Sequence, residues 1–432
     1  MFSAWIVAGC LVLAQAPETP ADLERAQANK VLESKVKKQL RLIQDSDAIA
    51  DREAAVKQLI EMGPSILPFL VLPKTADDPD LLIRVEQVRV TLEKQQAKQF
   101  AEARQVTLAA NEQPVSQVLA QLEKQGETKL LDYRERFGEE AADPKITVDL
   151  KGVPFWKALD QVLDAARLTR YPNPESAGIA YHNLPEGILP AFGKADYPGP
   201  FRVEAAEMQV MRNLRRKGAA GVLLNVEVAW EPRLRPIAMF QNLSDIKMLD
   251  ENGDPLKFEQ SDATQELSLS PGDTSATLSL SLEAPPRNIK KIGTLKGKIE
   301  ALVPSKVEKF EFPSLQAKTP IVKKQGGATV SIDQIRKNNE VWEIRVIVRF
   351  EKASGALESH RDWALDNPCL LITPKKTLEH DAMELFRRDD DSIGVAYLFD
   401  VEDLKNCSLT YETPVLIMKL PIEYELKDIE LP

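Results

Sequence analysis

The sequence predicts a multidomain α+β protein in which helices come first and strands follow. Helical periodicity runs through the first hundred residues, two strand-and-helix stretches between residues 105 and 184 resemble each other, and apolar residues alternate with polar ones from residue 200 onward. A period near 3.6 indicates helices, whereas a period of two indicates strands. The 432 residues are enough for about two to four domains. We therefore expect an N-terminal helical segment, a small βαβ–βαβ domain and two C-terminal antiparallel β-sandwich domains.

The first residues are typical of a secretory leader. The apolar run AWIVAGCLVLA precedes a small-x-small pattern that ends at Ala16, and the run is too short to span a bilayer as a helix. We predict a signal peptide over residues 1–16 and a periplasmic or secreted protein. The stretch VAGC also resembles a bacterial lipoprotein box, in which Cys10 would carry lipid. No later stretch is apolar enough for a transmembrane segment in the mature chain.

Residues 17–104 carry the helical pattern. The segment 20–44 is rich in Ala, Leu, Lys, Glu and Gln, and DREAAVKQLIEMG places its apolar residues on one stripe before Gly63. The order of this helix, a Gly-Pro turn, a Leu-Pro helix and an Asp-Pro opening of the next helix resembles HEAT-type repeats over residues 45–98. The resemblance implies stacked helix pairs that present a surface to other proteins.

The next domain, residues 105–184, repeats one pattern twice. The stretch VTLAANEQPVSQVLAQL is followed by ITVDLKGVPFWKALDQVLDAARLTRY. In each, an alternating strand leads into a helix at a proline, Pro114 or Pro154, and the helix places its apolar residues on one face. The pattern predicts β-α-β twice, with both helices packed on a small sheet.

These two stretches resemble the STN domain, the short N-terminal domain that secretins share with TonB-dependent transducers. The matching order is a strand, an N-x-P-V-x-x-V-L helix, a strand and a G-V-P-F-x-x-A-L-D-x-V-L helix. The linker between the halves, YRERFGEEAADP, is longer than a tight turn, and no plug, barrel or secretin core follows. In those families the domain is an envelope protein-interaction module, so the resemblance implies another envelope protein as partner.

Strand patterns fill the rest of the chain. Five Gly or Pro residues break the stretch PEGILPAFGKADYPGP before its final Gly-Pro, which predicts a linker. Beyond it, TLKGKIEALVPSKVEKFEF aligns with SLTYETPVLIMKLPIEYEL, and other segments repeat at a similar spacing of about 114–122 residues. Period-two segments punctuated by turns indicate sandwiches. We predict a linker, a first sandwich, a second linker and a second sandwich, at residues 185–199, 200–316, 317–326 and 327–432.

Two cysteines remain after the leader is removed, Cys369 and Cys407. In an oxidising compartment they form a candidate disulfide, provided that the fold brings their Cα atoms within about 7 Å. The alternative is two separate buried thiols, because free cysteine packs as a small apolar residue.

Four residues form the candidate interaction surface. The stretch WEPRLRP places Trp230 near Arg233 and Arg235, and arginine beside an aromatic ring suits a binding surface. The alternative is a tryptophan in a sandwich core at the end of a strand. Lys157 is the fourth candidate, on the second helix of the STN-like domain.

The sequence predicts no enzyme. The usual nucleophile, zinc, P-loop and dinucleotide motifs do not occur, and the three histidines are far apart with no cysteine cluster. We therefore predict no catalytic residues, no cofactor and no metal, and we read the acidic stretches DENGD and RRDDDS as turns. The net charge of −10 disfavours nucleic acid, which requires a basic face.

These observations favour a non-enzymatic exported envelope protein that acts as a protein-interaction or scaffold module. One alternative is a protein that binds glycan or another surface polymer, which predicts exposed aromatic residues on one face of a sandwich. Another is an enzyme with two carboxyl groups about 5–10 Å apart in a pocket.

Overall fold

The computed structural model confirms a mixed α+β chain with helices first and antiparallel sheets after them. It describes residues 20–70, 79–172, 178–212, 215, 220–258, 262–270, 272–316, 318–325, 327–338, 340–351, 355–358 and 361–431. The predicted signal peptide and Cys10 lie outside these residues. The chain divides into two compact units, residues 1–96 and 97–432.

The first unit is helical. It contains α1 (Pro20–Asp45), α2 (Ile49–Glu61), the 3-10 helix η1 (Pro64–Phe69) and most of α3 (Pro79–Ala101). The apolar stripes of these helices face one another in a core that includes Ile43, Leu59 and Val88. Gly63 follows α2 with a positive φ of 76°, a conformation that glycine adopts without steric cost. The HEAT resemblance of this unit remains a prediction.

The repeated pattern between residues 105 and 184 folds as two similar halves. Strand β1 (Gln105–Pro114) pairs antiparallel with β3 (Lys145–Pro154), and each runs straight into a helix, α4 (Val115–Gly126) or α5 (Phe155–Ala165). The apolar faces of both helices lie in one core. A second sheet has the order β2-β5-β4, from Leu130–Asp132, Ile179–Asn183 and Leu168–Tyr171. The two repeated strands thus pair with each other.

The C-terminal region contains two sheets with matching strand order. The first has the order β6-β7-β8-β12, and the second has β14-β15-β16-β20 followed by β19. The strands of the first sheet are β6 (Ala195–Asp196), β7 (Phe201–Arg212), β8 (Ala220–Trp230) and β12 (Ser275–Glu283). Those of the second are β14 (Ile321–Gln325), β15 (Ala328–Asn338), β16 (Val341–Phe350), β19 (Ala382–Arg388) and β20 (Ser392–Phe399). The sequence repeat therefore corresponds to a repeat of topology.

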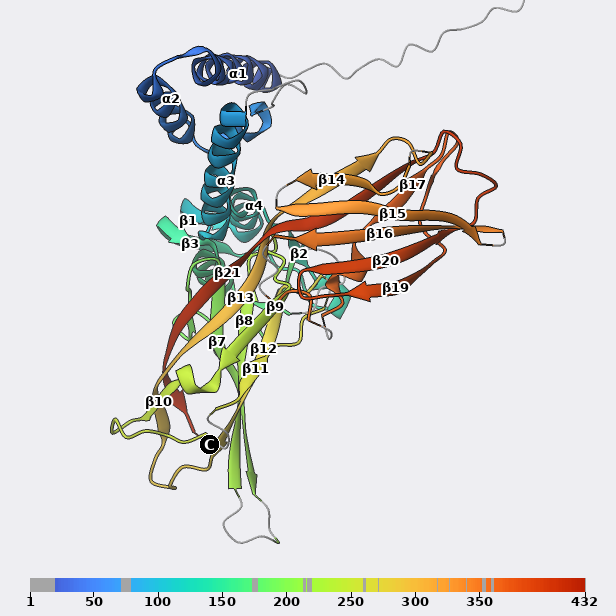
Figure 1. Cartoon of the computed structure of the whole chain (residues 1–432). Helices are drawn as coiled ribbons and strands as arrows, with labels where there is room; N and C mark the ends of the chain where they lie inside the picture. The colour runs from blue at the N-terminus through green and yellow to red at the C-terminus, as the bar shows by residue number, and fades with distance from the viewer. Residues whose placement is uncertain are drawn as a thin grey trace, which may run out of the picture. The chain divides into compact units, whose positions relative to one another are not determined.

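A third, larger sheet packs against both of them (Figure 1). Its central strands are β13 (Lys291–Phe312) and β21 (Ser408–Glu430), which pair antiparallel along almost their whole length. Shorter strands flank them: β9 (Ala238–Asn242), β10 (Lys247–Asp250), β11 (Thr264–Glu266), β17 (Cys369–Ile372) and β18 (Thr377–Leu378). The short 3-10 helices of the second unit are η2 (Glu135–Phe137), η3 (Leu243–Asp245) and η4 (Trp363–Asp366).

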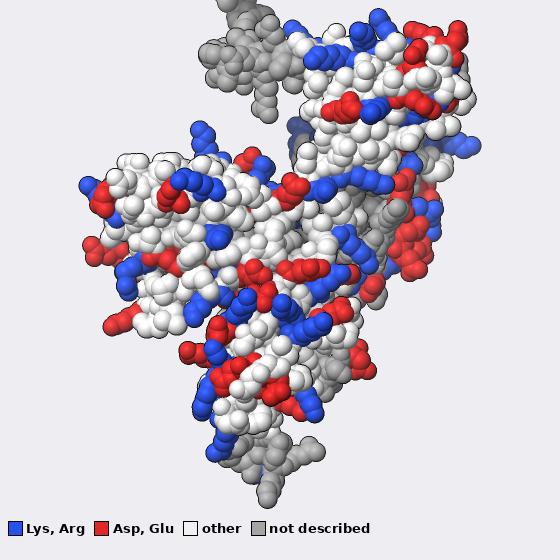
Figure 2. All heavy atoms as spheres, turned by 90° about the vertical axis from the view of Figure 1, so that its left-hand side faces the viewer, with Lys and Arg blue, Asp and Glu red and all other residues white. Residues whose placement is uncertain are grey.

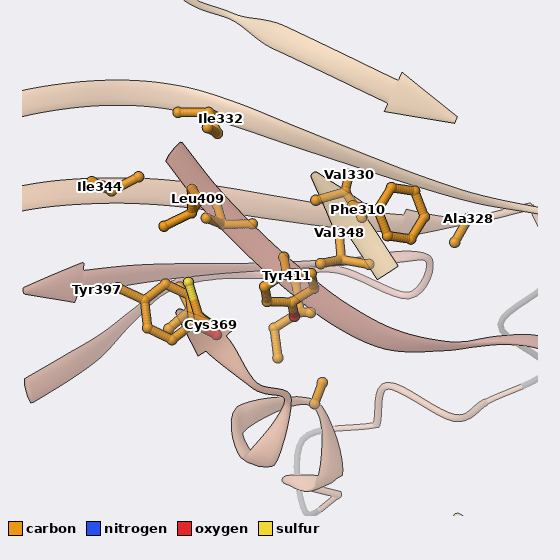
Figure 3. Packing of buried hydrophobic residues seen from close by; sticks show 14 of the residues in the cluster. Phe310, Ala328, Val330, Ile332, Ile344, Val348, Cys369, Tyr397, Leu409 and Tyr411 are labelled. Carbon is orange, nitrogen blue, oxygen red and sulfur yellow. The ribbon is translucent and has the colours of Figure 1, made fainter. Parts of the chain in front are cut away.

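Each long strand contributes to two hydrophobic cores. The core under the first sheet takes Ile299 from β13 and Tyr424 from β21. The core under the second sheet takes Phe310 from β13 and Leu409 from β21. Figure 3 shows this second core, where side chains of β15 and β16 meet those of β13 and β21. Because a strand alternates its faces along its whole length, one long strand can serve two cores in succession.

The predicted boundaries between the two sandwiches differ from the structure in two ways. The last part of β21 belongs to the first core, although the sequence repeat assigned residues 327–432 to the second sandwich. The predicted linker 317–326 contains β14, which pairs with β15 from Ile321 to Gln325. The local alternation of residues specifies a strand, but the partner of that strand is decided by the whole chain.

Shared strands make a specific prediction for Tyr424. Its ring is 3% exposed and lies so close to Gly297 that a Cβ there would be 2.4 Å from Tyr424 Cζ. Tyr424→Ala should cost about 3–5 kcal/mol, as for other buried aromatic rings. Amide exchange should accelerate in β7 and β8 of the first sheet, far away in sequence. Glu423→Ala, at the exposed neighbouring position, is the control. Faster exchange confined to β15 and β16 would contradict shared strands.

Candidate interaction surface

The loop before β6 exposes large apolar side chains. Ile188 is 56% exposed, Leu189 71% and Phe192 43%. All three lie within nine residues, in the stretch PEGILPAFG, which sequence analysis assigned to a linker. Single exposed apolar residues are common on protein surfaces, but several in one place indicate a contact surface.

This apolar loop is held in place by α5. Asp164 accepts hydrogen bonds from the backbone amides of Ala191 (3.1 Å) and Phe192 (2.7 Å). Burial raises the pKa of Asp164 above its usual value, and the two amides only partly offset this effect. Turn hydrogen bonds from Ile188 to Pro185 and from Lys194 to Ala191 fix the remaining backbone. These hydrogen bonds fold the predicted linker into turns and attach it to α5.

A second feature of the same domain is an aromatic cluster. Tyr133, Phe137, Tyr171 and His182 stack edge to face or tilted, with ring centroids 5.2–6.3 Å apart. Phe137 is 44% exposed. The guanidinium of Arg136 lies 5.1 Å from the centroid of the Tyr133 ring. Rings with an accessible face and a neighbouring cation suit contacts with apolar or aromatic groups of a partner.

The acidic linker YRERFGEEAADP contains two rings of this cluster and is hydrogen-bonded to β5. Glu139 accepts a hydrogen bond from the amide of Asn183 (2.8 Å) and lies 3.1 Å from His182 Nδ1. Partial burial works to raise the pKa of Glu139, but the bonds from Asn183 and His182 outweigh it and the pKa is lower than usual. Asp143 accepts bonds from both the amide and the hydroxyl of Ser116 at the start of α4. The residues that make this linker longer than a tight turn therefore bind it to α4 and to the end of β5.

The predicted surface around Trp230 is wrong in its central residue. Trp230 is 2% exposed and belongs to the core under the first sheet. It continues the alternation of β8, in which Val222 to Val228 point inward at every second position, so its phase in the strand buries it. The alternative, a tryptophan in a sandwich core at the end of a strand, is therefore the one that the structure has.

The two predicted arginines have different environments. Arg233 donates to Glu231 (2.7 Å) and to the carbonyl oxygen of Glu102, and Glu231 also accepts from the amide of Arg104 (2.9 Å). Arg233 thus joins the first sheet to the segment before β1. Arg235 is exposed.

Lys157 lies half-buried on α5, the helix that also carries the buried Asp160. Asp160 and Arg202 are each 1% exposed and lie 2.7 Å apart. Arg202 also donates to Glu204 (2.6 Å), and the Tyr197 hydroxyl donates to Asp160 (2.7 Å). Burial opposes the charge of Arg202, but the two carboxylates outweigh it and raise its pKa. This ion pair joins α5 of the domain at residues 105–184 to the first sheet.

The candidate disulfide does not form. Cys369 and Cys407 are both free thiols and both buried. Cys369 pairs with Tyr411, whereas Ile372 pairs with Ser408, so Cys407 lies four positions along the strand. Four residues of strand span about 13 Å, which exceeds the reach of a disulfide. Burial raises the pKa of both thiols. The alternative of two separate buried thiols is therefore the observed state.

The acidic stretches form turns. In DENGD, Asp250 Oδ1 accepts from the amides of Asn252 (2.7 Å) and Asp254 (2.9 Å). In RRDDDS, Asp389 contacts Arg387 and Ser392. The described part of the chain has no group of three or more His, Cys, Asp or Glu side chains arranged to hold a metal ion.

Two open hollows of about 590 and 450 Å³ lie on the helical unit. The first follows α1 and the second lies between α2 and α3, and charged side chains line both. Figure 2 shows one face of the whole molecule, on which Lys and Arg are interspersed with Asp and Glu. The described residues on that face form no continuous basic stripe.

Within the described ranges, none of the helices combines the length and the apolar character needed to cross a membrane. Comparisons with protein-family models, with curated proteins and with solved structures found no match to this chain.

The bond from Asn183 to Glu139 should depend on pH. Because the folded pKa of Glu139 is lowered, its stabilisation is present above the ordinary glutamate value of about 4.3 and is lost as the pH falls through the folded pKa. Exchange of the Asn183 amide should therefore be slower in the wild type than in Glu139→Gln at neutral pH. The difference should shrink in acid, and a constant difference from pH 7 to pH 3 would contradict the assignment.

The ionic joint should be sensitive to the loss of one partner. Asp160→Ala leaves the Arg202 guanidinium buried without its main counter-charge, which should cost about 3–5 kcal/mol. Urea unfolding measures this cost. The double variant Asp160→Leu, Arg202→Met should recover most of it, because a buried pair replaced by apolar groups is often neutral. If the single variant were as stable as the wild type, the joint would not hold the domains together.

Proposed function

We propose that this protein is a non-enzymatic exported envelope protein that acts as a protein-interaction or scaffold module. The observation that carries the proposal is the apolar loop, in which Ile188, Leu189 and Phe192 are exposed on a backbone fixed by Asp164. Apolar side chains on a fixed turn suit insertion into an apolar groove of a partner protein. Little ordering entropy is then lost on binding.

The buried joint supports a scaffold role. Arg202 and Asp160 connect α5 to the first sheet, and Arg170 contacts Glu227 on the same sheet at 3.1 Å. Trp156 Nε1 also donates to the carbonyl oxygen of Pro200 (3.1 Å). These contacts hold the STN-like domain and the sheet as one body, so that surfaces on both are presented in a fixed relation. The STN resemblance and the predicted export favour a partner in the envelope.

The alternative, binding of glycan or a surface polymer by the C-terminal sheets, has less support. It requires exposed aromatic residues on a sheet face. Among the described residues, the exposed aromatic side chains are Phe137 and Phe192, and neither belongs to the C-terminal sheets. The large apolar residues that those sheets expose are aliphatic or methionine, such as Val210, Met211 and Met383.

Photo-crosslinking in cells tests the proposal. A crosslinking amino acid at position 189 should give one dominant protein adduct in the envelope fraction. The same residue placed at Lys375, in an exposed turn, is the control. With the crosslinker at 189, Phe192→Ser should reduce the adduct by about tenfold or more, as expected for an anchor residue worth over about 1.4 kcal/mol.

Asp164→Ala provides a second variant, which removes the anchor of the loop but keeps its apolar side chains. It should weaken the adduct less than Phe192→Ser does, because the partner can still order the loop at an entropic cost. If the exported protein gives no adduct from position 189 or from position 137, the interaction proposal is wrong.

A further inference from the structure

In the part of the chain that the structure describes, the strand β12 has an outer edge that is mostly unpaired. It ends the order β6-β7-β8-β12 and pairs with β8 from Ser275 to Glu283 without a register shift. Within the described residues, its other edge meets only Lys257 and Phe258, near Leu282 and Glu283. Because the Glu283 amide donates outward to Lys257 (3.0 Å), the amides at every second residue back to Ser275 also point outward.

The second repeat shows what this edge can accept. Its equivalent of β12 is β20, and β20 carries β19 antiparallel on the corresponding edge. In the first repeat, the segment before β12 contributes β11, which pairs instead with β9 in the larger sheet. Among the described residues, the first sheet therefore has no strand at the position that β19 occupies in the second sheet.

Three other edge strands, β14, β19 and β6, have features that discourage pairing, and β12 does not. The edge strand β14 carries Lys323 and Lys324, β19 has a bulge between Leu385 and Arg387, and β6 has two residues. Lysines, bulges and short length are the usual protection of an edge strand. The run SATLSLSL in β12 has no charge, proline, glycine or bulge.

We infer that the outer edge of β12 pairs with β12 of a second copy of this chain, to form a two-fold symmetric dimer with one continuous sheet. A register centred on Leu278 pairs all of 275–281 with the same residues of the other copy. Leu278 then meets its own copy, and Ala276 meets Leu280 on the core-facing side. Thr277 meets Ser279 on the other side, and the paired residues 275–281 carry no charge. This inference is independent of the proposed partner protein.

The chain already uses this kind of pairing twice. Strand β1 pairs antiparallel with its repeat β3, and β13 pairs antiparallel with its repeat β21. In both cases two similar strands meet about a local two-fold axis. A pair of β12 strands would repeat the arrangement between two molecules.

Disulfide crosslinking tests the register. In an antiparallel pair, residues that exchange hydrogen bonds have Cα atoms about 5.5 Å apart, which is within disulfide range. An equal mixture of full-length Thr277→Cys and Ser279→Cys chains should form mixed dimers on mild oxidation. Each variant alone should crosslink much less, since the like cysteines are then diagonal neighbours. The native Cys369 and Cys407 are buried and should not interfere.

Sedimentation equilibrium of the full chain tests the dimer itself. Thr277→Lys should raise the dimer dissociation constant by roughly tenfold or more, because edge lysines oppose pairing. Thr277→Pro should do the same while it keeps the bonds to β8, since only an outward amide is lost. Gln209→Lys, at an exposed position on β7, is the matched control and should leave dimerisation unchanged.

A monomer at all concentrations would overturn the inference, as would a dimer that none of the β12 variants weakens. A monomer that instead binds an extended peptide at β12 would assign the edge to a different occupant. None of these results depends on adducts from the apolar loop, so failure here and failure of the proposed function are distinguishable.

Discussion

The antiparallel pairing of β13 with β21 is the interaction on which the rest of the C-terminal region depends. These strands pair from Lys291 with Glu430 to Phe312 with Leu409. One half of the pair forms the floor of the first core and the other half forms the floor of the second. The first core takes Ile422, Tyr424 and Leu426 from the end of β21, so it is complete only when that end has paired with β13. The two cores are therefore coupled through a strand pairing of high sequence separation.

The same solution appears at two scales. The repeat of about 40 residues between residues 105 and 184 pairs β1 with β3, and the repeat of about 114 residues pairs β13 with β21. A strand has free hydrogen-bonding groups on its edge, and an antiparallel copy of the same strand satisfies them with matching length and alternation. Duplicated strands are therefore ready partners for each other.

Buried charges specify how the domain at residues 105–184 joins the first sheet. The Asp160–Arg202 pair is almost fully buried, and Glu204 and the Tyr197 hydroxyl make further hydrogen bonds with it. Such a pair adds little net stability compared with apolar packing, but any misplacement leaves a charge without a partner. The joint thus selects one arrangement of the two parts, and the apolar loop beside it gains a defined position.

The sequence by itself determined most of the helices and strands and the faces that they bury, although it assigned β6 and β14 to linkers. Periodicity placed α4, α5 and the paired strands correctly, and the phase of β8 places Trp230 in the core. It also indicated two repeats, because similar segments produce similar alternation. These properties are local, since each depends on neighbouring residues in the chain.

Only the tertiary structure decided which strands pair, which loop is exposed and which charges are buried. The exchange of β21 into the first core, the separation of Cys369 from Cys407 and the capture of the apolar loop by Asp164 all join residues distant in sequence. The stretch PEGILPAFG resembles a linker because Gly and Pro report backbone freedom and not the carboxylate that removes it. The period and composition of a segment do not specify such partners, because they depend on which distant segments the fold brings together.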